Sequence, residues 1–480
     1  MPPEYLKAWT RDEALVEILR DRLQGLGPVT ASALAAPLGL ATTEVEAALV
    51  RLENEGSVMR GRFSPDAAET EWCERRLLAR IHRYTVIRLR REIEPVEARD
   101  FLRFLFEWQR VAPEARVEGA DAVANIVSQL EGFEAPAAAW ETEILPARVN
   151  EYDPAWLDEL SRAGRVVWTR IAPLHSSGER APSPVRTTPI ALASRRNLGI
   201  WAALAPDGNG INLTSRAQRA EEFITTHGAS FFEEIVGGTG LLRTQVEEAL
   251  AELVAQGIVN ADSFGGLRAL LVPSDRRRSF DGHRRMRRTA LFGIEDAGRW
   301  ALVRRKPAGA KPGLRSESES GEIVEHVART LLRRYGVVFW RLIAREADWL
   351  PPWRELLRCY RRLEARGEIR GGRFVAGISG EQFAVPEAIG LLRDVRRRER
   401  TGAMVSLSGA DPLNLVGIVT PGGRLPALTG NRVLYRDGVP IALAVAGDVR
   451  FLEQLPPDAQ WAARGALLRR QVPAQLHFIG

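Results

Sequence analysis

One pattern occurs four times along this chain of 480 residues. Each copy opens at a glycine, passes through a short apolar helix and a longer amphipathic helix, and closes at a second glycine followed by alternating apolar and polar residues. The two glycines are 29, 32, 29 and 31 residues apart in the four copies. They are Gly27 and Gly56, Gly132 and Gly164, Gly228 and Gly257, and Gly336 and Gly367. Since chance rarely keeps one spacing four times, the pattern indicates a tandem array of one structural unit.

The order of signals within a copy predicts a winged helix. In the second helix of the first copy, apolar residues recur at i, i+3, i+4 and i+7, which is one helix face. These residues are Val45, Ala48, Leu49 and Leu52. The closing glycine suits a left-handed helix end, and the alternation after it predicts a two-stranded wing. Longer helices are expected upstream at residues 12–23, 215–226 and 322–335. The predicted fold class is mainly α with small β sheets, built as a tandem array of winged-helix modules.

The segments outside the repeats differ in composition. Residues 401–480 lose the helical period and alternate around Asp437-Gly438, a strong hairpin signal, so we expect a β-barrel-like domain ending in a helix over 457–470. Stretches rich in Pro, Gly, Ser or Arg are interpreted as connectors. The predicted organisation is a winged helix at 1–66, a helical or winged-helix-like module at 67–131, a winged helix at 132–172, a loop connector at 173–212, a winged helix at 213–274, a basic connector and linker at 275–321, a winged helix at 322–400 and the β-barrel-like domain at 401–480.

Arginine supplies almost all of the positive charge. Lysine occurs only at Lys7, Lys306 and Lys311, so 64 of the 67 basic residues are arginine, and the net charge is +6 with a pI of about 9.7. Guanidinium groups fork onto phosphates and stack on bases, which makes nucleic acid a natural partner. The candidate nucleic-acid-binding residues lie on predicted wings and in the basic connector: Arg60, Arg62, Arg276, Arg277, Arg278, Arg284, Arg285, Arg370 and Arg373. For each arginine a merely solvated surface is the alternative, and tandem winged helices also serve as protein–protein interfaces.

Signatures of several enzyme classes are missing from the sequence. None of the three lysines follows a glycine, so there is no phosphate-binding loop and we expect no ATP hydrolysis by this chain. Cys73 and Cys359 are too few for a disulfide framework, and the six histidines show no ligand spacing, so we expect neither a metal nor a cofactor. No apolar run reaches the roughly 18 residues of a membrane helix, and the start lacks signal-peptide features. We expect a cytoplasmic protein that binds no membrane.

One stretch carries candidate catalytic groups. Asp100 and Glu107 are seven residues apart, so they share a face if the stretch is helical, and Trp108-Gln109 follows. A carboxylate beside an aromatic ring and an amide could serve base excision, in which a flipped base stacks and a water is activated. Asp100, Glu107 and Gln109 are therefore the catalytic candidates. The alternative is an amphipathic core helix with solvated carboxylates.

Several segments resemble the large helicase-related (Lhr) family. They are EWCERRLLARIHRYT from Glu71, RLRREIEPVEARDFLRFLFEWQ from Arg88, GFEAPAAAWETEILPARV from Gly132 and SPVRTTPIAL from Ser183. The opening PPEYLKAWTRDEAL also resembles an internal family stretch, so we expect Met1 to fall inside the longer family sequence. The resemblance covers essentially the whole chain and places it C-terminal to the helicase motor.

The resemblance implies a function that composition alone does not indicate. Lhr proteins are ATP-dependent 3′-to-5′ translocases on single-stranded DNA that unwind duplexes, favour RNA:DNA hybrids and act in DNA repair. The resemblance to their C-terminal region implies that this chain forms homo-oligomers, and we expect a tetramer. ATP and Mg²⁺ are expected only for the motor domain. Winged-helix DNA glycosylases resemble this region and carry a Gln-x-Gln or Gln-x-Asp motif, which Gln109-Arg110-Val111 does not complete.

The sequence therefore predicts a non-motor region that assembles with copies of itself and guides single-stranded DNA or RNA:DNA hybrids. The enzyme alternative is a winged-helix glycosylase that excises uracil or alkylated bases. A sequence-specific regulator is the third possibility. The four repeats argue against it, since a typical regulator has one winged helix plus a sensor or dimerisation domain.

Overall fold

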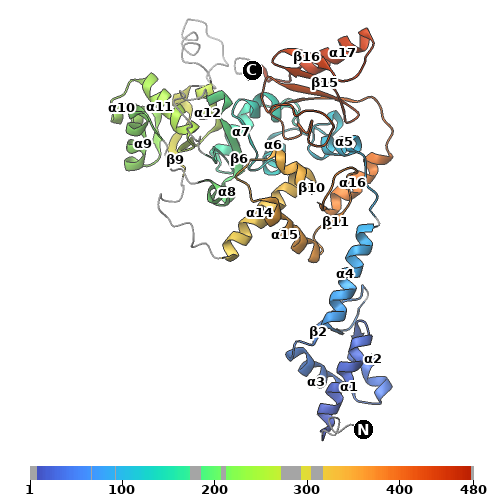
Figure 1. The fold of residues 1–480 in the computed structure, drawn as a ribbon. Coiled ribbons are helices and arrows are strands. Elements are labelled where there is room, and N and C mark those ends of the chain that lie inside the picture. Colours follow the sequence, from blue (N-terminus) through green and yellow to red (C-terminus); the bar gives the residue numbers. More distant parts are fainter. Residues whose placement is uncertain are drawn as a thin grey trace. The chain divides into compact units, whose positions relative to one another are not determined.

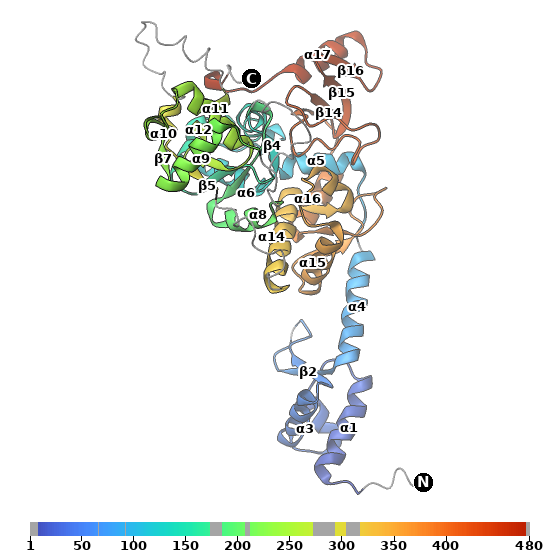
Figure 2. The same ribbon diagram turned by 60° about the vertical axis from the view of Figure 1, so that its left-hand side comes forward.

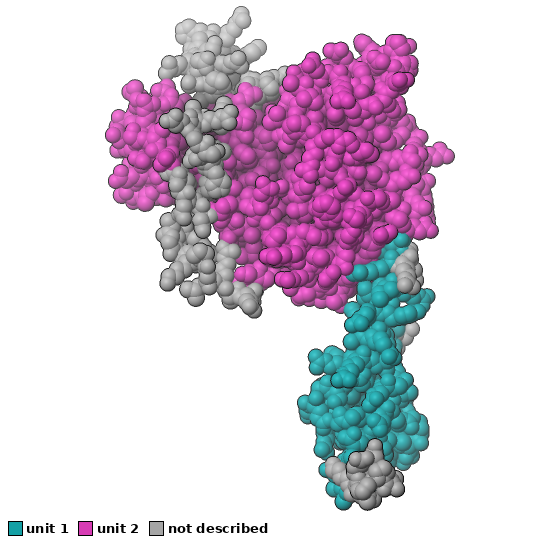
Figure 3. Space-filling view, in the orientation of Figure 1, with its two compact units in different colours: residues 1–93 teal, residues 94–480 magenta. Residues whose placement is uncertain are grey.

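A computed structural model describes residues 8–65, 67–91, 93–172, 185–206, 212–271, 293–303 and 317–476. The chain forms two compact units, residues 1–93 and residues 94–480 (Figure 3). The first unit contains one three-stranded sheet with its helices, and the second contains three such sheets and a four-stranded sheet. Among the described residues, no single helix is long and apolar enough to cross a membrane, and one bent pair in the first unit passes by length and composition only.

The four three-stranded sheets have the same topology. Each is antiparallel, and in each the third strand in chain order lies between the first and the second. The orders are β1-β3-β2, β4-β6-β5, β7-β9-β8 and β10-β12-β11. Each first strand is preceded by a helix, and helices separate it from the second strand. This is the winged-helix plan, so the predicted tandem array is confirmed.

The first module shows how the repeat encodes its local structure. The apolar face predicted at Val45, Ala48, Leu49 and Leu52 is buried in its core. Gly56 has φ 70°, the left-handed conformation expected after that helix, and the closing glycine of every other copy is left-handed too. The elements are α1 (Arg11–Gly25), β1 (Val29–Thr30), α2 (Ala31–Ala35), η2 (Ala36–Leu38), α3 (Thr42–Asn54), β2 (Val58–Gly61), β3 (Glu71–Glu74) and α4 (Arg75–Arg91).

The second and third modules share one hydrophobic core. Trp168 of β5 and Trp300 of β9 meet edge to face at 6.5 Å inside it. The second module contains η3 (Pro113–Ala115), α6 (Ala120–Gln129), β4 (Glu134–Pro136), the π-helix η4 (Trp140–Ile144), α7 (Pro154–Arg162), β5 (Val166–Thr169), η5 (Val185–Thr187), β6 (Pro189–Ser194), η6 (Arg195–Asn197) and α8 (Leu198–Leu204). The third contains α9 (Ser215–His227), β7 (Ser230–Phe231), α10 (Phe232–Thr239), α11 (Arg243–Ala255), β8 (Val259–Ala261), α12 (Phe264–Leu271), η8 (Ile294–Asp296) and β9 (Arg299–Leu302).

The fourth module packs against α5 (Ala98–Trp108), a helix far from it in sequence (Figures 1 and 2). Phe101 of α5 contacts Phe339, with ring centroids 5.7 Å apart. A bridge between Val96 and Val375 joins the two segments just before α5. The module contains α14 (Glu317–Tyr335), β10 (Val337–Phe339), η9 (Trp340–Arg345), α15 (Trp353–Ala365), β11 (Arg370–Gly372), β12 (Gln382–Ala384) and α16 (Pro386–Arg397).

The C-terminal domain is an open antiparallel meander covered by one helix. Its strands are β13 (Met404–Ser408), β14 (Arg432–Arg436), β15 (Val439–Val445) and β16 (Asp448–Phe451), followed by α17 (Pro457–Leu468) and η10 (Ala474–Leu476). Among the described residues β13 and β16 do not pair, so the expected barrel is not seen. Asp437 and Gly438 turn between β14 and β15 with φ of 48° and 79°, as predicted for a tight hairpin.

The wings differ from the predicted two-stranded hairpins. The strand that closes each sheet comes later in the chain, at β3, β6, β9 and β12. The predicted connectors 173–212 and 275–321 therefore contain β6 and β9, and the first sheet extends beyond residue 66 to Glu74. Likewise 67–131 is not one module, because β3 belongs to the first sheet and α5 packs on the fourth module. The strands of one wing can lie this far apart in sequence because the entropic cost of closing a loop grows only slowly with its length.

Buried arginines join the parts of the second unit. Arg268 of α12 bonds Glu141 of η4 at 2.7 Å and Asp158 of α7 at 3.0 Å, which ties the third module to the second. Arg148 holds Asp411 of the C-terminal domain through two bonds of 2.7 and 3.0 Å. Such pairs are weak evidence of net stability, but removing one partner from them is costly.

Candidate nucleic-acid interface and junction cavity

The helix α4 follows the wing of the first module without a loop. The Glu74 carboxylate accepts a hydrogen bond from the Leu77 backbone N–H at 2.6 Å, which satisfies one of the free donors of the first turn. From this start the helix runs through seven arginines and one histidine with no acidic residue. It therefore concentrates positive charge along one element.

The exposed side chains of α4 combine charge with apolar surface. Arg76, Arg80 and Arg83 are exposed and lie at i, i+4 and i+7, on one side of the helix. Tyr84 is 69% exposed, and Ile81 is also exposed. In the sequence, only a family resemblance distinguished this stretch. The acid-free run of arginines was the signal that could have identified it as an interface.

The predicted wing arginines of the first module lie on the same unit as α4. Arg60 is exposed but makes a 3.4 Å ion pair with Glu53 and lies over the Trp72 ring. Arg62 is exposed. The loop after it is held by the Glu71 carboxylate, which accepts bonds of 2.7 and 2.8 Å from two backbone N–H groups. The backbone at the tip of this wing is thus fixed near Arg62.

The other predicted arginines fall into two groups. Arg370 and Arg373 are exposed at β11 in the fourth module, and the side chain of Gln382 holds the loop that follows them. Arg276, Arg277, Arg278, Arg284 and Arg285 lie outside the described residues. In sequence, these five come between α12 and β9.

The predicted catalytic stretch is helical, as α5, but its polar groups are all engaged. Asp100 is 5% exposed and bonds Arg103 at 3.1 Å. Both oxygens of Glu107 accept from Arg398, at 2.8 and 2.9 Å. These contacts favour the alternative, in which α5 is an amphipathic core helix. That alternative expected solvated carboxylates, whereas both acids are ion-paired.

Gln109 is fully buried just after α5. Its carbonyl oxygen accepts from Arg148 at 2.8 Å, and its amide donates to the Arg334 backbone oxygen at 2.9 Å. The structure does not bring the three candidates together. Glu107 lines a cavity of about 460 Å³, while Asp100 and Gln109 do not.

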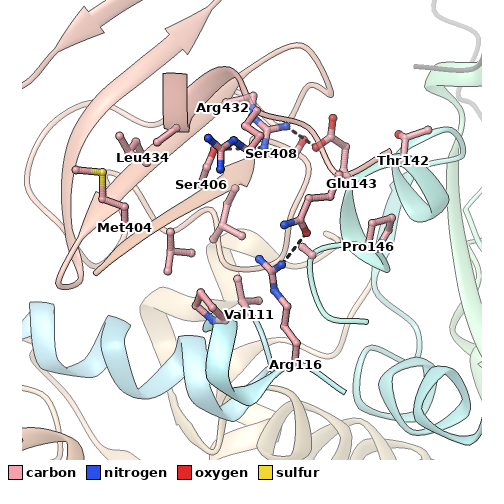
Figure 4. Close-up of a pocket in the computed structure, with 17 residues that line it drawn as sticks. Val111, Arg116, Thr142, Glu143, Pro146, Met404, Ser406, Ser408, Arg432 and Leu434 are labelled. Carbon is pink, nitrogen blue, oxygen red and sulfur yellow. Dashed lines mark hydrogen bonds and ion pairs between the residues drawn. The ribbon is translucent and has the colours of Figure 1, made fainter. Parts of the chain in front are cut away.

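A second cavity, of about 290 Å³, lies between the second module and the C-terminal domain (Figure 4). We call it the junction cavity. Its polar lining comes from five separate segments of chain, which is why no sequence motif indicated it. These residues are Arg116, Thr142, Glu143, Ser406, Ser408, Arg432, Arg469 and Gln471.

Among the residues that the structure describes, Glu143 is the one carboxylate lining the junction cavity, and arginines hold it. Glu143 bonds Arg432 at 2.5 Å, and Arg470 lies 3.8 Å from its other oxygen. Burial raises the pKa of Glu143, and Arg432 opposes that rise. Across the cavity, Arg116 donates to the Gln471 side chain at 2.8 Å. Burial lowers the pKa of Arg116.

The fold and the basic surface define a class: a tandem winged-helix array with a C-terminal sheet domain. Two family models match it, both described as "Large helicase-related protein, winged-helix domain". The third such domain of the family matches residues 96–193, and the fourth matches residues 317–404. The third domain thus runs across the boundaries predicted at 131 and 172.

Two curated relatives match most of the chain. The "Lhr helicase/ probable uracil glycosylase" of Mycolicibacterium smegmatis is 29% identical over 468 residues, covering 92% of this chain and 29% of the relative. The "Lhr helicase/uracil glycosylase" of Escherichia coli is 28% identical over 437 residues, covering 83% of this chain and 26% of the relative. Together these matches support a C-terminal, winged-helix region of the Lhr family. The chain spans less than a third of the length of these relatives.

Proposed function

We propose that this chain guides single-stranded DNA and RNA:DNA hybrids for an Lhr-type 3′-to-5′ helicase that acts in DNA repair, without an ATPase motor of its own. The observation that carries the proposal is α4, an exposed helix with seven arginines and no acid. At 1.5 Å per residue its 17 residues extend for about 25 Å, enough to follow several phosphates.

The exposed aromatic ring makes single strands the favoured partner of α4. Tyr84 lies one turn from Arg80, so a base can stack on the ring while the guanidinium holds its phosphate. Base stacking tolerates any sequence, because every base has a flat face. We therefore expect binding that is independent of sequence and strongly dependent on salt.

Fluorescence anisotropy of the full chain with labelled single-stranded DNA, across a salt series, tests this proposal. Replacing Arg76, Arg80 and Arg83 with glutamine should lower the slope of log affinity against log salt by about 2, at about 0.7 per phosphate contact. The matched control replaces three exposed arginines elsewhere with glutamine: Arg219, Arg450 and Arg464. An equal loss of slope in both triple variants would reject α4 as the binding element.

We propose further that the chain assembles with copies of itself, with a tetramer expected. Trp168 offers no surface for assembly, because it is 1% exposed in the core shared by the second and third modules. The support comes instead from Trp461 on α17, which is 82% exposed. Leu468, which is 48% exposed, lies at i+7 from Trp461 on the same side of α17, and grouped exposed apolar side chains mark interfaces. Light scattering at micromolar concentration should give a multiple of the chain mass that falls in Trp461→Ser, and a wild-type monomer would reject the proposal.

Uracil excision is the second candidate activity. It is favoured by the names of both relatives and by Glu107, which lines the 460 Å³ cavity beside Phe106. An incision assay on uracil-containing single strands should lose activity in Glu107→Gln and keep it in Asp100→Asn, because Asp100 is on the same helix but outside the cavity. Equal activity of both variants would exclude Glu107 as the catalytic acid.

A further inference from the structure

The junction cavity holds more positive than negative charge. Arg116, Arg432 and Arg469 line it, and Arg470 lies behind its single lining carboxylate, Glu143. Glu143 is shared between Arg432 and Arg470. One lining carboxylate therefore faces three lining arginines.

The charge of Arg116 is compensated only in part, by the nearby Glu114 carboxylate, which does not line the cavity. The hydrogen-bonded partner of Arg116 is the neutral side chain of Gln471, at 2.8 Å. Its Nε is buried and has no hydrogen-bond partner among the described residues. Figure 4 shows the Arg116 side chain reaching toward the polar groups of the cavity. Its position suits an anion.

The remaining wall of the junction cavity is apolar. Val111, Pro146, Leu434 and Ala466 contribute to it. A volume of about 290 Å³ lies at the lower limit of small-molecule sites, which are commonly 300–1,000 Å³. The cavity thus offers arginines for one charged group and a small apolar space for a compact body attached to it.

We propose that the junction cavity binds one nucleoside monophosphate, either free or as the phosphorylated end of a strand. The phosphate would lie against Arg116 and Arg469, whose planar forks match its oxygens. The sugar and base would occupy the apolar wall. This site is independent of α4, which lies in the other compact unit.

Isothermal titration calorimetry of the full chain with deoxycytidine monophosphate tests the assignment, with deoxycytidine as the probe that lacks the phosphate. The monophosphate should bind, and the nucleoside should bind at least about 10-fold more weakly. Arg116→Met should weaken monophosphate binding by about 10-fold or more, because it removes a charged hydrogen bond and keeps much of the volume. No heat from the monophosphate at millimolar concentration, or equal affinity for the nucleoside, would overturn the proposal.

A second variant guards against misfolding. Arg469 is exposed, so Arg469→Gln leaves the core intact and should also weaken binding of the monophosphate. Arg464→Gln, an exposed arginine of α17 outside the cavity, should leave binding unchanged. If neither Arg116→Met nor Arg469→Gln weakens binding, the cavity is not the site. The triple variant of α4 should keep its monophosphate affinity even where it loses strand binding, which separates this proposal from the proposed function.

Competition distinguishes the two sources of the ligand. A short strand with a 5′ phosphate, compared with the same strand lacking it, should displace the monophosphate if the site takes strand ends. Displacement by free nucleotides alone would assign a free ligand. If both strands displace it equally well, the terminal phosphate is not recognised, and the proposal fails.

Discussion

Replacing Arg268 with methionine removes the only cation from a buried cluster of two acids. Arg268 is fully buried, and it bonds Glu141 at 2.7 and 2.8 Å and Asp158 at 3.0 Å. Tyr152 donates a further bond of 2.8 Å to Glu141. Methionine replaces the aliphatic part of the side chain but leaves both carboxylates without their charge partner.

The expected cost of this substitution is large. Removing one partner from a buried ion pair costs about 3–5 kcal/mol, because an uncompensated charge stays buried. With a urea m value of about 2–3 kcal/mol/M, the unfolding midpoint should fall by about 1–2 M. Trp168 and Trp300 lie in the core shared by the second and third modules, so tryptophan fluorescence reports the transition.

The effect should depend on pH with a defined sign. Burial raises the pKa of Glu141 above its ordinary value, and Arg268 opposes that rise. A raised carboxyl pKa means that the folded state binds a proton more tightly than the unfolded chain, so that stability is present at low pH and is lost as the pH rises through the folded pKa. Without Arg268 the pKa of Glu141 rises further. The deficit of Arg268→Met should therefore be smaller at pH 5 than at pH 7.5.

An exposed arginine on α9 of the third module provides the control. Arg216 pairs with Glu248 at 2.8 Å, with side chains 49% and 67% exposed, so Arg216→Met should cost less than about 1 kcal/mol at either pH. Equal costs for Arg216→Met and Arg268→Met, or a deficit of Arg268→Met that grows toward pH 5, would refute the reasoning.

Three further predictions concern the hairpin, the wings and the missing motor. Gly438 and Gly447 both have positive φ, but only a methyl at Gly438 would lie 2.0 Å from an α5 carbonyl oxygen. Gly438→Ala should therefore destabilise the C-terminal domain more than Gly447→Ala in urea unfolding. Similar costs would contradict the docking of the hairpin on α5. Hydrogen bonds from Ser64 lower the pKa of Glu71 in the folded state. The contribution of Glu71 to the stability of the first wing is therefore present above its unfolded-state pKa and is lost as the pH falls through its folded-state pKa. Protection of the first wing's amides in hydrogen exchange should therefore fall on acidification and in Glu71→Gln, whereas the fourth wing, held by the neutral Gln382, should not respond to acid. The purified chain should show no DNA-stimulated ATP hydrolysis, and measurable turnover would contradict the absence of a phosphate-binding loop.

The repeating unit could be predicted because its signals are local. The apolar face of α3, the left-handed glycine after it and the turn at Asp437-Gly438 each depend on residues within a few positions of one another. Helix periodicity and turn chemistry act over that range, so one sequence is enough to detect them. The family resemblance had the same origin, in short stretches of specific residues.

The strands that complete the sheets could not be assigned in this way. β6 and β9 pair across long insertions, and a strand of three to six residues carries little signal of its own partner. Pairing is decided by which edges and apolar faces meet when the modules pack. For this reason β6 and β9 lie in segments that the sequence had suggested were connectors.

The role of each arginine was likewise a matter of tertiary structure. In sequence, Arg148 and Arg268 resemble Arg62 and Arg80, yet the first two are fully buried and the last two are exposed. A guanidinium is stable in either place, because water or a carboxylate can compensate its charge. Only the folded chain decides which of the two surrounds it. The junction cavity, assembled from distant segments, exists only at that level.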